Sequence, residues 1–154
     1  GFNYGGEPVI IPSLDGVGKM SKSNGENTCI YLGEDAESIR KKIMKATTSA
    51  TPTEPNSPKT EAVQNIFDLM KLVSSNETMY HFEEAYNNCN IRFGDMKKQI
   101  AEDMITFLAP IRENILKYSS DKKLLNKVLE AGNEKARESA AKTIREVREI
   151  IGLK

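Results

Sequence analysis

The sequence has no tryptophan, one histidine and two cysteines among its 154 residues. Cys29 and Cys89 lie far apart, and no Cys-x-x-Cys pair occurs. A structural zinc site takes four cysteine or histidine ligands at short spacings, so we expect no metal site of this kind. Two isolated thiols are typical of a protein in a reducing cytosol, and we predict a cytoplasmic location.

An excess of charge of either sign is also lacking. The 22 Lys and Arg residues balance the 22 Asp and Glu residues. This balance argues against a strongly basic protein that neutralises many nucleic-acid phosphates, but it leaves room for a local RNA contact. Aromatic residues make up 6% and charged residues 29% of the chain, which fits a soluble helical protein better than a β-sandwich or barrel.

Long apolar runs are absent as well. No run is long enough to span a bilayer, and the start of the chain has no secretory signal pattern. We therefore expect no membrane contact. The chain opens with Gly-Phe-Asn-Tyr and no initiator methionine, so we predict that it is a fragment of a longer protein.

One short stretch, residues 16–25, concentrates groups that bind anions. Lys19 and Lys22 carry compact positive charges that suit phosphate oxygens. Ser21 and Ser23 can donate further hydrogen bonds, and the three glycines of the stretch let the backbone turn and approach a ligand closely. The pattern predicts a mobile loop that clamps a polyphosphate. An ordinary basic surface turn is the alternative.

Two apolar runs flank this loop. Val9–Ile11 is predicted to form a short buried strand that ends at Pro12. Residues 28–32 form a second strand-like run, which Gly33 stops. Beyond this point the sequence shows no convincing strand.

The rest of the chain has the i, i+3, i+4 spacing of amphipathic helices. Asp35 is the expected N-cap of a first helix, and the Pro-rich residues 46–58 are an expected linker. Ser57 is expected to cap the next helix, with Pro58 at its first position. Further helices are predicted to begin at Asn76, at Gly94 and after Asp121, with Gly132 breaking or bending the last of these and Ala136–Ile151 forming a final helix that Glu138 and Lys142 support.

Two other features allow more than one interpretation. Arg40, Lys41, Lys42 and Lys45 cluster on the first helix, either as a solvated face near a helix C-terminus or as a contact with an RNA backbone. His81 lies off the apolar stripe of its helix, and no acid or nucleophile pairs with it in the sequence. We expect it to be structural or exposed.

Residues 19–23 read Lys-Met-Ser-Lys-Ser, which is letter for letter the KMSKS signature of class I aminoacyl-tRNA synthetases. The order of the segments that follow resembles the C-terminal half of the tryptophanyl-tRNA synthetase family. The loop motif is specific to the class. The tail segments separate this family from most other members of the class, though less sharply from its tyrosyl relatives. The supporting segments are residues 11–14, 30–32, 39–44, 94–98, 110–113, 134–137 and 147–149.

The resemblance implies a mostly α fold. A helical bundle of the anticodon-binding type would follow the short strand and KMSKS loop that end a Rossmann-type catalytic domain. Residues 1–34 would close that nucleotide-binding domain. Residues 35–154 would form the α-helical tRNA anticodon-binding region, with the last helix packing back toward the catalytic domain.

The chemistry of the family is activation of tryptophan by ATP, followed by transfer to tRNA(Trp). The resemblance makes Lys22 the first choice, and Lys19 the second, for stabilising the leaving pyrophosphate. Mg²⁺ would arrive with ATP, held mostly by phosphates and water. The ATP contacts implied are Ile11 through its backbone, Lys19, Met20 by packing, Ser21, Lys22 and Ser23.

The HIGH-like motif and the tryptophan pocket of the family lie upstream of this loop, and nothing in this chain matches them. We therefore expect that this chain alone does not activate tryptophan. The implied partners are tRNA(Trp), with tryptophan and ATP in a full-length enzyme that is expected to be a homodimer. Two alternatives stay open: a fragment of a tyrosyl-tRNA synthetase, or a free-standing helical RNA-binding or scaffold module.

Overall fold

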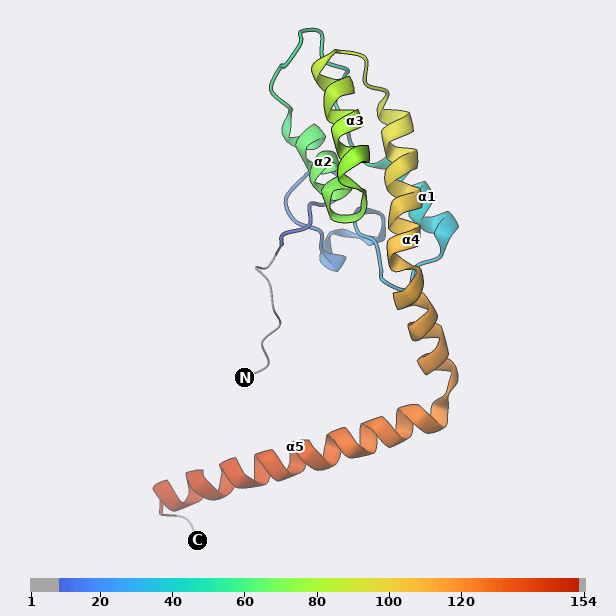
Figure 1. The fold of residues 1–154 in the computed structure, drawn as a ribbon. Helices are drawn as coiled ribbons and strands as arrows, with labels where there is room; N and C mark the ends of the chain where they lie inside the picture. The colour runs from blue at the N-terminus through green and yellow to red at the C-terminus, as the bar shows by residue number, and fades with distance from the viewer. Residues whose placement is uncertain (1–8, 153–154) are drawn as a thin grey trace. The chain divides into compact units, whose positions relative to one another are not determined.

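The computed structural model describes residues 9–152 and is mostly α-helical (Figure 1). This confirms the mostly α fold class. The described chain divides into two compact units, the first ending at Arg112 and the second beginning at Glu113. The domain boundary expected after residue 34 stays a prediction. The elements are the 3₁₀ turns η1 (Lys22–Asn24) and η2 (Glu26–Thr28) and the helices α1 (Ala36–Lys45), α2 (Glu61–Val73), α3 (Asn76–Asn87), α4 (Phe93–Ser120) and α5 (Lys122–Ile150).

The two predicted strands are wrong. Val9 and Ile10 are 67% and 76% exposed instead of buried, and residues 28–32 continue from η2 into irregular chain. Within the described residues the only β pairing is one isolated antiparallel bridge between Pro12 and Lys19. A strand satisfies its backbone groups by pairing with a neighbour over several residues. Among the described residues, the run Val9–Ile11 pairs only through the bond between Ile11 and Met20, which is too little for a strand.

Three helices start where the sequence predicted, and each start has a side-chain cap. Asp35 caps α1, and its carboxylate accepts the Ser38 N–H at 3.0 Å. Ser75 caps α3, which begins at Asn76 as predicted. Asp121 caps α5 in the same way as Asp35 caps α1. A side-chain oxygen at each N-cap satisfies a backbone N–H that has no partner inside its helix.

Helix α2 begins at Glu61, three residues later than the sequence suggested. The Ser57 hydroxyl donates to the carbonyl of Glu54 at 2.7 Å and does not cap a helix. The Pro58 carbonyl accepts the hydroxyl of Tyr86 at 3.3 Å. These bonds hold residues 57–58 outside the helix.

The core of the first unit is built from the apolar stripes of its helices. Val63, Ile66, Phe67 and Met70 of α2 are buried, as their spacing predicts. Helices α2 and α3 run side by side (Figure 1). The rings of Phe67 and Tyr86 meet edge to face across them, with 5.9 Å between centroids.

Polar contacts join α4 to α1. The buried Lys97 ammonium donates to the carbonyl of Ala46, the C-cap of α1, at 2.6 Å. A cation is favourable at a helix C-terminus, although burial lowers the pKa of Lys97. The Arg40 guanidinium donates two hydrogen bonds, of 2.6 and 2.9 Å, to the Glu102 carboxylate. The C-terminal end of α1 is therefore fixed against the first half of α4.

In the second unit, α5 runs through Gly132 without a break, so the predicted break is wrong. One glycine inside a helix costs only about 1 kcal/mol relative to alanine, and the good helix formers around it offset that cost. Lys142 pairs with Glu146 at 4.0 Å and not with Glu138. Helix α5 buries no side chain within the described structure, and its expected packing on a catalytic domain stays a prediction.

None of the described helices combines the length and the apolar character that crossing a membrane requires.

Candidate functional site

The predicted anion-binding loop, residues 16–25, is called the lysine loop below. Together with the preceding residues 11–15 it begins as a short hairpin. The Met20 N–H donates to the Ile11 carbonyl at 2.8 Å, and the Ser13 N–H donates to the Gly18 carbonyl at 3.0 Å. Gly16 and Gly18 have φ values of +84° and +65°, a region that side-chain-bearing residues rarely adopt. The glycines expected to shape the loop are therefore needed for its turn.

The second half of the loop forms η1. Ser21 caps this turn and accepts the Ser23 N–H at 3.3 Å, and Gly25 ends it with φ +105°. Lys19 and Lys22 are exposed. Neither lysine forms an ion pair with any residue in the described part of the chain. Both ammonium groups can therefore meet an anion from solvent.

The turn of the hairpin, residues 14–17, is anchored to the rest of the first unit. Leu14 is buried. Its N–H donates to the Thr28 carbonyl at 3.1 Å, and its carbonyl accepts the Thr47 N–H at 2.9 Å. The Asn65 side chain of α2 donates to the Gly16 carbonyl at 3.2 Å. The loop thus has a fixed turn, followed by a cationic arm, residues 19–22, whose two lysines are exposed.

A hollow of about 460 Å³ opens beside this arm. It brings together three of the six predicted site residues and leaves Ile11, Lys19 and Ser23 outside its lining. The Met20 side chain packs against the core, and its sulfur accepts the Ile30 N–H at 3.4 Å. The lining consists of Met20, Ser21, Lys22, Cys29, Ile30, Tyr31 and Leu32.

Lys42 of the basic cluster has a structural position. Its ammonium is buried, pairs with the carboxylate of Glu34 and donates to the Cys29 carbonyl at 3.1 Å. It also lies 5.0 Å from the centroid of the Tyr31 ring. Lys42 therefore ties the segment that leaves the loop to α1, a role that the sequence pattern did not reveal.

The acid that pairs with Lys42 is held ionised. Burial by itself raises the pKa of Glu34, but hydrogen bonds from Lys42, Ser38 and the Tyr31 N–H outweigh it. The pKa of Glu34 therefore lies below its usual range. The ion pair is complete at neutral pH.

The other cations of the basic cluster lie at the surface. Arg40 pairs with Glu102, and Lys41 pairs with Glu37 at 2.7 Å. Lys45 is exposed and has no carboxylate within pairing distance among the described residues. Most of the charge of the cluster is thus matched by carboxylates, which favours the interpretation as a solvated face over the one as an RNA contact.

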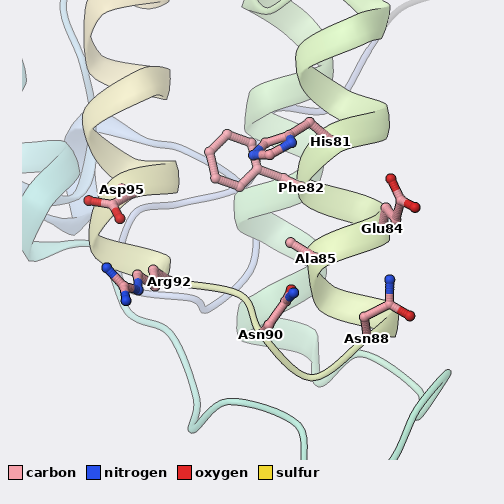
Figure 2. A pocket seen from close by; sticks show the side chains of 8 residues that line it. All are labelled: His81, Phe82, Glu84, Ala85, Asn88, Asn90, Arg92 and Asp95. Carbon is pink, nitrogen blue, oxygen red and sulfur yellow. The ribbon is translucent and has the colours of Figure 1, made fainter.

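A second hollow, of about 390 Å³, is formed by α3, the turn after it and the start of α4 (Figure 2). The rings of His81 and Phe82 meet there edge to face, with 5.1 Å between centroids. His81 is exposed, as expected. Sequence reasoning missed this hollow because its residues come from two helices and share no spacing. The lining consists of His81, Phe82, Glu84, Ala85, Asn88, Asn90, Arg92 and Asp95.

Metal ligands do not gather in the described part of the chain, where no group of three or more His, Cys, Asp or Glu side chains could hold an ion. Cys29 and Cys89 are free thiols.

Three comparisons place this chain among known proteins. The tryptophan–tRNA ligase of Porphyromonas gingivalis is 51% identical over 153 residues, which cover 99% of this chain and 46% of that relative. The crystal structure of tryptophanyl-tRNA synthetase from Campylobacter jejuni, complexed with ADP and tryptophan, matches with a TM-score of 0.75 and 26% identity, over 96% of this chain and 44% of that one. Tyrosyl-tRNA synthetase from Aeropyrum pernix matches with a TM-score of 0.58 and 24% identity, over 77% of this chain and 37% of that one, which shows the fold alone.

This chain spans less than half the length of these relatives. The model of the family described as class I tRNA synthetases (W and Y) matches residues 6–109. That range contains the lysine loop, its anchors and both hollows. The chain belongs to the family of class I tRNA synthetases for tryptophan and tyrosine.

Proposed function

We propose that this chain supplies the pyrophosphate-binding loop and the tRNA-facing helices of a tryptophan–tRNA ligase. The observation that carries the proposal is the pair of exposed ammonium groups, Lys19 and Lys22, which have no ion-pair partner among residues 9–152 and lie on an arm that follows an anchored turn. Cations that are already in place when charge develops lower a barrier without reorganisation during the reaction.

The proposed reaction begins with attack of the tryptophan carboxylate on the α-phosphate of ATP. The bond between the α-phosphate and the bridging oxygen breaks, and pyrophosphate leaves with the negative charge. Lys22, with help from Lys19, meets that charge in the transition state, where stabilisation raises the rate. The hydroxyls of Ser21 and Ser23 can donate to the same phosphate oxygens.

The donor set of the loop fits a polyphosphate. Its ammonium and hydroxyl groups offer several donors, and no described carboxylate cluster competes for a metal ion. Mg²⁺ would be held by the ATP phosphates and water. The Ile11 carbonyl accepts the Met20 N–H and keeps a second lone pair, so this oxygen could still accept a hydrogen bond from adenine.

Tryptophan is favoured over tyrosine as the amino acid. The relative with 51% identity is a tryptophan–tRNA ligase, whereas the tyrosyl neighbour supports only the shared fold. The tryptophan pocket and the dimer contact are expected in the part of such relatives that this chain does not span. The alternative of a free-standing RNA-binding or scaffold module gives no function to the two exposed lysines of the cationic arm.

The transfer step needs a contact with tRNA(Trp), and the hollow between α3 and α4 is the best candidate in the first unit. Unpaired RNA bases stack on aromatic rings or on guanidinium groups, and their edges bond to polar side chains. Figure 2 shows His81 and Phe82 on one side of this hollow, with Arg92 just before α4 and Asp95 in its first turn. His81 and Arg92 are exposed, whereas Phe82 is buried, so the imidazole and the guanidinium are the groups on which a base could stack.

Substitution of Lys22 tests the proposed role of the loop. In a protein that joins this chain to its nucleotide-binding half, Lys22→Ala should lower kcat for tryptophan-dependent pyrophosphate exchange on the order of a hundredfold. The affinity for tryptophan should change little, because the contact belongs to the transition state. Lys22→Arg should restore the rate only in part, since a planar fork differs from a point charge.

The matched control is Lys71→Ala, which removes an exposed lysine near the end of α2 and should leave the exchange rate unchanged. Equal losses of kcat and tryptophan affinity in Lys22→Ala would contradict the proposed role.

A further inference from the structure

We propose that Asn65 is a positioning residue for the lysine loop. Its side-chain amide, in the middle of α2, donates to the Gly16 carbonyl at 3.2 Å. This bond fixes the turn of the hairpin that carries the cationic arm. The inference rests on the proposed function, because it assigns Asn65 a part in placing Lys22 for the reaction with ATP.

The hairpin transmits the position of its turn to the arm. Hydrogen bonds from Ser13 to Gly18 and from Met20 to Ile11 join its two sides. The turn itself is stiffened by the Asp15 carboxylate, which accepts the Val17 N–H at 3.1 Å. A displacement of the turn therefore moves residues 19–22 with it.

Several contacts hold the hairpin in place. Leu14 is buried and has two backbone hydrogen bonds, and the Met20 side chain packs against the core. The Asn65 bond adds a contact from α2 at the turn, which limits rotation of the turn about Leu14. Among the described residues, Asn65 is the one α-helical residue whose side chain bonds to residues 11–25.

The choice of asparagine at position 65 of α2 supports a role in binding the turn. Asparagine is a poorer helix former than alanine or glutamine because its side chain competes for backbone bonds. Asn65 is half-buried and lies between the exposed Gln64 and the buried Ile66. Gly16, whose carbonyl accepts this bond, has φ +84°, so the bond joins Asn65 to the residue whose conformation shapes the turn.

The test compares two substitutions of Asn65 with a matched control substitution of Gln64. Asn65→Leu and Asn65→Asp both remove the donor, one with an apolar group of the same size and the other with a carboxylate. Gln64→Leu makes the same amide-to-leucine change one residue earlier, where the amide bonds only to Asp68 at 2.8 Å in its own helix. An effect of the lost donor should appear in both Asn65 variants and be absent from Gln64→Leu.

The first measurement is limited trypsin digestion of the full 154-residue chain, read by mass spectrometry. Cleavage after Lys19 and Lys22 is compared with cleavage after Lys142 in α5. Both Asn65 variants should accelerate the loop cleavages about fivefold, the factor that loss of one ordinary hydrogen bond supplies. Unchanged loop cleavage, or equal acceleration in Gln64→Leu, would overturn the proposal.

The second measurement is pyrophosphate exchange by a protein that includes the nucleotide-binding half. The Asn65 variants should lose about fivefold in kcat with an unchanged KM for tryptophan, since a looser arm must be ordered in the transition state. Faster cleavage with unchanged kcat would also overturn the positioning role. If the unsubstituted protein exchanged no pyrophosphate with tryptophan, the proposed function would fail, while digestion would still decide whether Asn65 fixes the loop.

Discussion

Lys22 and Lys42 lie near each other in the sequence but have different surroundings. Lys22 is exposed on η1 and has no acidic partner in the described chain. Lys42 is buried and is held by Glu34 and by the Cys29 carbonyl. Solvent exposure leaves the first ammonium for a ligand. Burial commits the second to the fold, because a buried charge is stable only when it is paired.

The buried pair gives a prediction for stability. Lys42→Met should lower the free energy of unfolding by about 3 kcal/mol at neutral pH, since it leaves the Glu34 carboxylate buried without its partner. Urea unfolding followed by circular dichroism measures this change. Lys41→Met is the matched control. It removes an exposed ammonium from the preceding position and should leave the unfolding midpoint unchanged.

The same pair gives a prediction for pH dependence. The pKa of Glu34 is lowered in the folded protein, so between the two pKa values the unfolded state binds more protons and stability rises with pH. The contribution of the pair should be lost as pH falls below about 4.3 and through the folded pKa. In Lys42→Met, only the hydrogen bonds from Ser38 and the Tyr31 N–H still oppose burial, so the pKa of Glu34 should rise and acid should destabilise the variant less than the unsubstituted protein. The gap in stability between the two proteins should therefore narrow in acid, and a constant gap would count against the pair.

At the scale of elements, α5 differs most from its sequence pattern. Gly132 lies inside a continuous helix, and a Cβ added there would meet no described atom within 4 Å beyond its chain neighbours and the backbone of its own helix. Gly132→Ala should therefore increase the helix content and stabilise α5 by up to about 1 kcal/mol. Circular dichroism during thermal unfolding measures both.

Ala131→Gly is the matched reverse change at the preceding exposed position and should weaken the helix by a similar amount. If Gly132→Ala lowered the helix content, the glycine would mark a break after all.

At the scale of the whole molecule, the two proposed steps use different parts of the first unit. The cationic arm would serve activation, and the hollow between α3 and α4 would serve binding of tRNA(Trp). Arg92→Ala should therefore lower kcat/KM for tRNA roughly tenfold, the loss that one stacked base commonly represents. Tryptophan-dependent pyrophosphate exchange should stay unchanged.

Aminoacylation and exchange assays on the same preparation measure the two steps separately. Lys71→Ala removes a cation from α2 outside both hollows and should affect neither. Equal losses in both assays for Arg92→Ala would show that the hollow contributes to folding of the unit and not to tRNA binding.

The sequence by itself determined three of the helix starts and the charged and hydroxyl groups that the loop carries. Asp35, Asn76 and Asp121 marked helix starts because caps and apolar spacing act over a few residues, and the family resemblance of residues 19–23 predicts the role of the two lysines. Only the tertiary structure decided that Val9–Ile11 pairs with too little chain to form a strand, that Lys42 is buried against Glu34, and that Asn65 reaches Gly16. Each of these depends on residues that are distant in the sequence or on a partner surface, and local patterns carry no information about such contacts.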